Sequence, residues 1–386
     1  MDGSADEAIA FAATASGSKV LAVWGDAPTR DGGPRLHARM FDGTSWLEQL
    51  DVGSFSRGGP LTLVADDAGG GYAQWSDLVG GRRALFDFDA GAFDAEALPI
   101  PPGTRGADLV AFPAGAISAY PAEAGVVAQA WNAGAGVWED TALDVPRVPR
   151  VHVQLAENGT GHVGALVAFT DRGYGYLALS VYDGSSWSAT AVMERPMSVI
   201  GDRFRIGLMP DDTILLLWPD EGVTVLRVDP KVPRGSQLGA LQTLDTRVPP
   251  GIALISEIVV DAQGRATVVW MERRTSDEVT IMVSRNAGAG WSAPRALGAV
   301  NHLVGLGLDA SSNVVMLAMA RAGRLVFFRG DAAADAWTML DADMSASASQ
   351  LDGRSMRLVF LPDGSISIVS LGLLPAGGVY SFSCRL

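Results

Sequence analysis

Cysteine, lysine and histidine are scarce in this sequence of 386 residues. The single cysteine, Cys384, excludes a disulfide within the chain, and its apolar surroundings (GVYSFSCRL) favour a packing role over a nucleophilic one. Lysine occurs only at Lys19 and Lys231, so arginine carries nearly all of the positive charge. That bias is typical of a GC-rich bacterial genome, although arginine is also the better residue for bidentate recognition of carboxylate or phosphate.

Positive charge as a whole is in the minority. The chain has 43 acidic and 29 basic residues, which gives a formal net charge of −14. Proteins that bind nucleic acid or an anionic membrane surface normally have the opposite balance. We therefore expect no nucleic-acid partner.

Long apolar runs are missing as well. A membrane-spanning helix needs about 18 or more consecutive apolar residues, and no such stretch occurs, so the sequence predicts no membrane span. Met1 is followed by DGSADEA, which lacks the basic and apolar regions of a signal peptide. We favour a bacterial periplasmic or extracellular location, with an export signal that this sequence does not include, over a cytoplasmic one.

The residues that usually hold metals or cofactors show no suitable pattern. The chain has four histidines without metal-ligand spacing, at His37, His152, His162 and His302. Acidic turns such as Asp66-Asp67-Ala68-Gly69 and Asp261-Ala262-Gln263-Gly264 lack the alternating ligands and the distal glutamate of a calcium loop, so we interpret them as hairpin turns. No glycine-rich phosphate loop precedes a helix. We expect no metal and no cofactor.

What the sequence does have is an internal repeat made of strands. Hydrophobic residues form 48% of the chain, enough for a large core, and the 46 glycines and 20 prolines are scattered at turns. The clearest copy begins near Ile255 and reads EIVVDAQGRATVVW, MERRTSDE, VTIMVSR and NAGAGWSAPRAL. A repeat of about 40–50 residues built only from strands is typical of a β-propeller.

Eight such repeats fill the chain, so we predict an all-β fold with a single propeller domain over residues 1–386. The blades are expected to be four-stranded and antiparallel, and a seven-bladed ring is the alternative if one terminal repeat is irregular. The last repeat shows three strands and lacks a fourth. The predicted blades span 9–53, 60–100, 107–145, 151–193, 204–247, 255–299, 302–344 and 355–386.

Aromatic residues recur at the end of the second strand of six blades, and an acid follows each of them. Because these positions are one element of the repeat, we expect them on one face of the disk, around the mouth of the central channel. A ligand-binding role there competes with a packing role as wedges between blades. The tryptophans proposed for ligand binding are Trp24, Trp75, Trp218 and Trp270, and the other two aromatics are Tyr120 and Phe169.

Arginines occur in the linkers that enter the first strand of most blades, and these linkers reach the same face. Several of these arginines would converge near the axis, where they could clamp a carboxylate, sulfate or phosphate. Alternatively, each pairs with an acid of the neighbouring blade. The candidates for ligand binding are Arg57, Arg105, Arg150, Arg203, Arg247 and Arg354.

One hairpin resembles the Asp box of the sialidase superfamily, S/T-x-D-x-G-x-x-W. Residues Ser284 to Trp291 read SRNAGAGW, with Asn286 in place of the aspartate, and looser copies precede Trp46, Trp138 and Trp187. In that family the box is structural, so the resemblance implies the fold rather than an activity. Physically, the Asx side chain bonds the turn and the tryptophan anchors it on the blade.

The same resemblance implies a possible catalytic set. A sialidase-like enzyme would need three arginines on the substrate carboxylate, a tyrosine nucleophile, a glutamate that activates it and an aspartate as general acid. The candidates in this sequence are Tyr174, Tyr176, Asp171, Glu123 and Glu272.

The sequence thus favours a non-catalytic binding or scaffold propeller over an enzyme. We expect it to be a monomer and to hold a glycan, an anionic small molecule or a protein partner at the channel mouth. The alternative is a sialidase-like glycan-processing enzyme that acts on an acidic sugar.

Overall fold

A computed structural model gives the fold of the chain. It describes residues 10–26, 33–56, 61–66, 68–77, 80–98, 107–113, 115–122, 125–145, 151–171, 174–195, 204–219, 223–230, 241–245, 253–273, 279–320, 324–331, 334, 336–341, 351–361, 363, 365–372 and 379–385. All regular secondary structure in these ranges is β-strand. No helix in them is long and apolar enough to cross a membrane.

The described strands form eight antiparallel sheets in chain order. The first four sheets are β1 (Ala10–Ser16), β2 (Lys19–Gly25), β3 (Arg35–Phe41) and β4 (Leu50–Ser54); β5 (Leu61–Ala65), β6 (Gly70–Ser76), β7 (Gly81–Asp87) and β8 (Ala92–Leu98); β9 (Asp108–Phe112), β10 (Gly115–Ala122), β11 (Gly125–Asn132) and β12 (Val137–Thr141); and β13 (Val151–Glu157), β14 (Val163–Asp171), β15 (Tyr174–Tyr182) and β16 (Ala191–Arg195).

The other four sheets continue the same order. They are β17 (Arg205–Leu208), β18 (Ile214–Pro219), β19 (Val223–Val228) and β20 (Leu241–Asp245); β21 (Ala253–Val260), β22 (Ala266–Arg273), β23 (Val279–Asn286) and β24 (Arg295–Val300); β25 (His302–Leu308), β26 (Val314–Met319), β27 (Leu325–Gly330) and β28 (Trp337–Asp341); and β29 (Leu351–Phe360), β30 (Ser365–Gly372) and β31 (Val379–Arg385).

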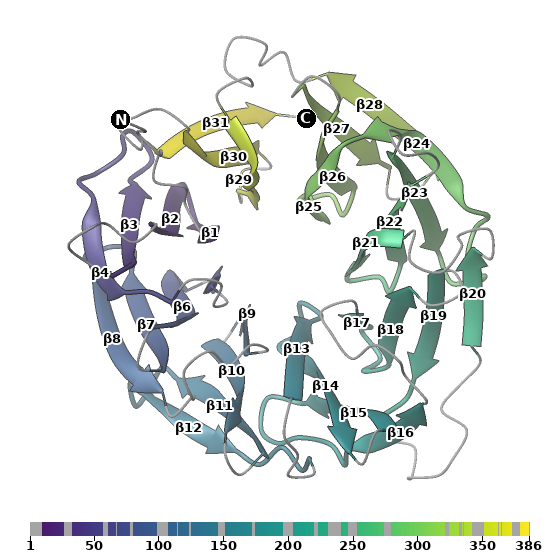
Figure 1. Cartoon of the computed structure of the whole chain (residues 1–386), viewed down its shortest axis with the longest axis horizontal. Coiled ribbons are helices and arrows are strands. Elements are labelled where there is room, and N and C mark those ends of the chain that lie inside the picture. Colours follow the sequence, from purple (N-terminus) through teal and green to yellow (C-terminus); the bar gives the residue numbers. More distant parts are fainter. Residues whose placement is uncertain are drawn as a thin grey trace.

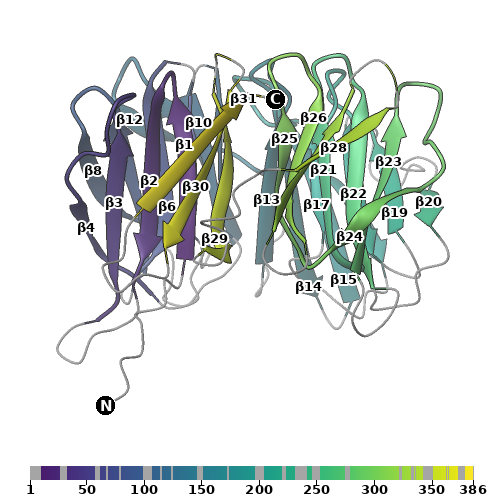
Figure 2. The same ribbon diagram turned by 90° about the horizontal axis from the view of Figure 1, so that it is seen from above.

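The sheets stand like blades around one axis (Figure 1). The first strand of each blade lies nearest the axis and the last lies at the rim (Figure 1). Seen from the side, the strands run between the two faces of a disk (Figure 2). This arrangement confirms the predicted eight-bladed propeller, with seven sheets of four strands and a last sheet of three among the described residues.

Strand alternation explains how each blade fills the space on both sides. In β22, Val268 and Trp270 pack against the fifth blade, whereas Val269 and Met271 pack against the seventh. Successive side chains of a strand point to opposite faces, so a strand between two blades is apolar at most positions. This requirement accounts for the apolar run VVWM at residues 268–271.

The ring closes by side-chain packing. Phe11 and Trp24 of the first blade share a buried cluster with Val359 and Val369 of the eighth. Among the described strands, none of the first blade pairs with the eighth sheet. Among the described residues, the first and last blades therefore meet by apolar burial.

Antiparallel order places the turns on two faces. The hairpins that join first to second strands and third to fourth strands all lie on one face, which we call the hairpin face. The connections from second to third strands and from blade to blade lie on the other, the linker face. The predicted channel-mouth site belongs to the linker face.

The acidic turns of the hairpin face bind their own backbone. The Asp66 carboxylate accepts hydrogen bonds from the N–H groups of Ala68 and Gly70, at 3.0 and 2.7 Å. Asp261 does the same for Gln263 and Arg265, at 3.0 and 2.9 Å. These Asx turns give the carboxylates a structural role in the hairpins.

Three of the hairpins that resemble an Asp box share one geometry. Asn286 accepts a hydrogen bond from the Gly288 N–H group at 2.8 Å, and Trp291 forms a β-bridge back to Asn286. Equivalent bridges join Phe41 to Trp46 and Tyr182 to Trp187. The turn is therefore held by an Asx bond at its tip and by the tryptophan at its base.

Candidate functional site

The sequence predicts an arginine clamp at the linker face. Its members Arg57, Arg105, Arg150, Arg203 and Arg247 fall outside the described residues, so their convergence stays a prediction. Arg354 is in β29, where only the backbone is described.

A neighbouring arginine shows how one position of this kind is used. Arg205, at the start of β17, donates from Nε to both carboxylate oxygens of Glu257 in β21, at 3.1 Å. Burial raises the pKa of Glu257 although the guanidinium lies beside it. Arg205 therefore ties the fifth blade to the sixth, as the alternative interpretation of the arginines expects.

The four tryptophans proposed for ligand binding are all buried between blades. Their exposed fractions are 5% for Trp24, 2% for Trp75, 5% for Trp218 and 0% for Trp270. Trp75 Nε1 also donates a hydrogen bond to the Ser54 carbonyl at 3.1 Å. Their observed role is the wedge between blades that the sequence also allowed, and a role in ligand contact remains untested.

The candidate catalytic residues are only partly described. The backbones of Asp171 and Tyr174 pair at the end of the β14–β15 hairpin, and the Tyr176 ring stacks on Phe169 at 5.3 Å between centroids. Glu272 is the second-last residue of β22, two blades further along the ring. Glu123 lies outside the described residues.

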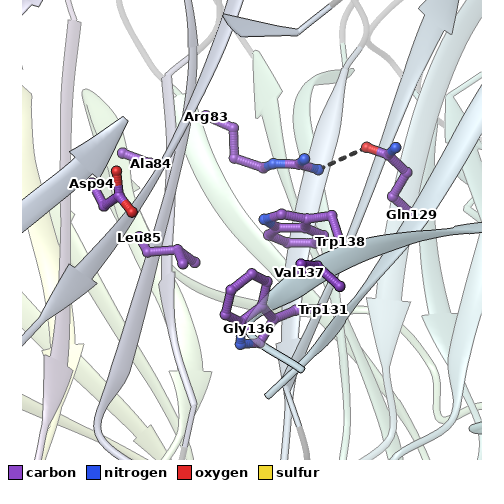
Figure 3. A pocket seen from close by; sticks show the side chains of 9 residues that line it. All are labelled: Arg83, Ala84, Leu85, Asp94, Gln129, Trp131, Gly136, Val137 and Trp138. Carbon is purple, nitrogen blue, oxygen red and sulfur yellow. Dashed lines mark hydrogen bonds between the residues drawn. The ribbon is translucent and has the colours of Figure 1, made fainter. Parts of the chain in front are cut away.

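A different site is described in full, at the rim between the second and third blades. It is a cleft of about 370 Å³, and Figure 3 shows its two walls. We call it the rim cleft. The residues that line it are Arg83, Ala84, Leu85, Asp94, Gln129, Trp131, Gly136, Val137 and Trp138.

Two tryptophans form the wall from the third blade. Trp131 of β11 and Trp138 of β12 are opposite each other in the strand register, with ring centroids 5.6 Å apart. Tyr72 of the second blade meets both rings edge-on, at 6.4 and 6.0 Å. Val137 is 48% exposed at the lip. The cleft therefore presents partly exposed aromatic rings that are held from behind.

Tyr72 is itself held firmly. Its hydroxyl donates a hydrogen bond to Asp66 Oδ2 at 2.6 Å. Burial, followed by the bond to that carboxylate, raises the pKa of Tyr72 far above its usual range. The phenol thus stays neutral and keeps its position as the support of the tryptophans.

Arg83 of β7 crosses from the second blade to the third. Its guanidinium lies 3.8 Å from the centroid of the Trp138 ring, and Nη1 donates to Gln129 Oε1 at 2.9 Å (Figure 3). Only 2% of Arg83 is exposed. A cation on an indole face is attracted by the ring quadrupole, and more strongly when water is excluded. Arg83 therefore fixes Trp138 in place.

Gln129 completes the polar part of the cleft. Its amide oxygen also accepts from the Tyr120 hydroxyl at 3.2 Å, and its amide nitrogen donates to Asp140 Oδ1 at 2.7 Å. Asp94 stands on the opposite wall, on β8 (Figure 3). The cleft thus combines an aromatic platform with an amide and a carboxylate.

Sequence patterns gave a partial signal for this site. Trp138 belongs to a loose copy of the Asp-box hairpin, but nothing marked it as exposed. The stronger signal is polar residues inside apolar strands, Arg83 in GRRALFD and Gln129 in GVVAQAWN. A long polar side chain at such a position must find a partner across the blade boundary.

Comparisons with known proteins support the fold only. No family model matches the chain, and no curated protein matches its sequence, so the Asp-box resemblance gains no support there. Similar solved structures include the polysaccharide lyase Uly1, at a TM-score of 0.53 and 10% identity over 89% of this chain and 94% of that one.

Two further solved structures resemble this chain in fold at low sequence identity. The Dos1 propeller has a TM-score of 0.54 and 11% identity, and the match covers 96% of this chain and 90% of that one. Puromycin hydrolase has a TM-score of 0.50 and 16% identity over 95% of this chain and 59% of that one. The chain is a β-propeller. At such low identity, this fold brings no activity with it.

Proposed function

We propose that this protein is a non-catalytic binding propeller that holds a glycan in the rim cleft. The observation that carries the proposal is the pair Trp131 and Trp138, partly exposed in a cleft and braced by the buried Arg83. Small-molecule sites are typically concave and mostly apolar, with a few placed polar groups, and have volumes of about 300–1,000 Å³. The rim cleft has a volume in that range and combines aromatic rings with a few polar groups.

A sugar suits these walls better than a purely apolar ligand. A pyranose ring has an apolar C–H face that packs on an indole, and its hydroxyls need hydrogen-bond partners at the edge. Asp94 supplies acceptor oxygens, and Gln129 has an amide nitrogen with two N–H groups, one of which donates to Asp140. The ligand would thus meet rings on one side and polar groups on the other.

The lining argues for binding without cleavage. Hydrolysis of a glycosidic bond usually needs two carboxyl groups, one on each side of the bond. Among the nine described residues that line the rim cleft, only Asp94 has a carboxyl group. The proposal therefore assigns a binding role and no turnover.

A glycan array tests the proposal. We expect the wild-type protein to bind a subset of glycans, and Trp138→Ala to lose at least about tenfold in affinity, because a stacked aromatic platform is a dominant contact. Trp291→Ala is the matched control, since Trp291 occupies the corresponding hairpin of the sixth blade and is also partly buried.

Circular dichroism of each variant confirms that it is folded before binding is compared. Absence of glycan binding by the wild type, or equal binding by Trp138→Ala, would contradict the proposal. Release of reducing sugar from a bound glycan would show that the protein is an enzyme. Binding that is insensitive to Trp138 but is lost with Arg57 and Arg105 would move the site to the predicted channel mouth.

A further inference from the structure

We infer that the rim cleft selects neutral sugars and rejects acidic ones such as uronic and sialic acids. The inference rests on the proposed function and specifies its ligand class. It differs from one alternative that the arginines of the chain suggested, an anionic small molecule at the channel mouth. Three features support it: the position of the Arg83 guanidinium, the positions of the Asp94 and Asp140 carboxylates, and the contact between Arg83 and the Trp138 ring.

The cation of the cleft is already engaged. Arg83 is the only positively charged residue among the described lining residues. Its guanidinium lies against the Trp138 ring and donates to Gln129, and only 2% of the residue is exposed. Among the described lining residues, a carboxylate in the cleft would therefore meet no exposed cation. It would lose its hydration without a charged partner in return.

Negative charge, in contrast, is exposed on one wall of the cleft and beside the other. Asp94 is exposed on β8, and Asp140 is exposed on β12, where it shares a sheet face with Trp138. Like charges a few ångströms apart repel even in water, with an effect of about fivefold in affinity for a pair near 4 Å. The net charge of −14 adds a weaker repulsion at low salt.

The same geometry disfavours a cationic ligand. An aromatic cage for an ammonium group needs ring faces that carry no other cation. The Arg83 guanidinium sits over the Trp138 ring and puts a positive charge at 3.8 Å from its centroid. A second cation on that ring would be repelled. A neutral ligand is repelled neither by the carboxylates nor by Arg83.

Asp94 is then the residue that decides between neutral and acidic sugars. As an ionised carboxylate it can only accept hydrogen bonds, and it can accept from two hydroxyls at once. A neutral sugar offers these donors. In an acidic sugar whose carboxylate faces the same wall, a negative charge that repels Asp94 replaces one of these hydroxyl donors.

Isothermal titration calorimetry with paired sugars tests the inference. The probes are disaccharides of glucose, mannose and galactose, each compared with the corresponding disaccharide of glucuronic, mannuronic or galacturonic acid. We expect the best neutral probe to bind at least about fivefold more tightly than its acidic counterpart in low salt. The ratio should fall as salt is raised, because screening weakens the repulsion.

Asp94→Asn supplies the decisive comparison. The variant removes the charge and keeps the shape, so we expect the acidic probe to gain severalfold in affinity relative to the neutral one. Glu139→Gln is the control, because it removes the same charge from the opposite face of β12. An unchanged neutral-to-acidic ratio in Asp94→Asn, or an equal change in both variants, would overturn the inference.

The result also separates this inference from the proposed function. Acidic sugars that bind as tightly as neutral ones, and lose binding in Trp138→Ala, would leave the function in place and refute the selectivity. If no probe binds, or if Trp138→Ala binds as the wild type does, the proposed function itself fails.

Discussion

Trp270 offers the sharpest test of how the ring is held together. It is fully buried between the fifth and sixth blades and shares a cluster with Leu217, Val225 and Met282. Truncation of a buried tryptophan to alanine costs about 3–5 kcal/mol, because the lost burial is added to the cost of the cavity that remains. We therefore predict that Trp270→Ala lowers the free energy of unfolding by several kcal/mol.

A further detail narrows the expected value. The Trp270 Nε1–H group is buried and has no hydrogen-bond partner among the described residues. A buried unpaired donor costs the wild type about 1–3 kcal/mol, and the alanine variant is relieved of that cost. The net loss should thus fall in the lower half of the range, near 3 kcal/mol. Trp270→Phe keeps most of the ring and also removes the N–H group, so it should cost clearly less.

Urea denaturation followed by far-ultraviolet circular dichroism measures both variants. Trp291→Ala, at a partly exposed position, serves as the reference for loss of a tryptophan as such. We expect Trp270→Ala to lose the most free energy of unfolding, and Trp291→Ala and Trp270→Phe each to lose less. If Trp270→Ala unfolded within about 1 kcal/mol of the wild type but lost its ligand, the wedge interpretation would be refuted.

Three more predictions concern other parts of the ring. Asp108 accepts hydrogen bonds from two backbone N–H groups, one of them that of Leu155 in the next blade, yet burial raises its pKa to about 6. The folded state therefore holds the Asp108 proton more tightly than the unfolded chain does, and the protonated side chain stabilises the fold fully below about pH 4. This stabilisation is lost as the pH rises through about 6. Urea midpoints measured across this range should decline, and the decline should be smaller in Asp108→Asn. Gly207→Ala would place its Cβ 2.8 Å from Val260 Cγ2 in the sixth blade, so we expect a loss of about 1–3 kcal/mol in the same assay, and an unchanged midpoint would show that the blades can separate freely. Trp24→Ala removes the wedge between the first and eighth blades, so amide exchange should accelerate in β1 and β29 more than in β13; uniform acceleration would argue against closure by this cluster.

The fold could be predicted because every repeat has the same pattern of apolar strands and tight turns. Largely apolar strands such as β22 are buried on both sides, and Asx and glycine turns such as the one at Asp261 reverse the chain between them. In each blade the local sequence preference for strands and turns agrees with the position of the segment in the fold. With eight copies of the repeat, the pattern can be recognised even where single copies are irregular. The last repeat was also expected to show three strands, and the last sheet has three among the described residues.

The site could be predicted far less well. Position in the repeat tells which face a residue reaches but not how deeply it is buried, so the sequence left Trp24 and Trp270 open between ligand contact and a wedge between blades, and the structure shows both side chains buried. The rim cleft depends on how the second blade approaches the third, and this spacing is set by the volumes of facing side chains such as Tyr72 and Trp138. Pairings between blades leave no periodic trace in a sequence.

The most direct test of the binding claim is a crystal structure of the protein soaked with the neutral disaccharide that binds most tightly. The account predicts density for a sugar ring between the second and third blades, with its apolar face against Trp131 or Trp138 and a hydroxyl within hydrogen-bond distance of Asp94. Density at the mouth of the central channel, with the rim cleft empty, would contradict it.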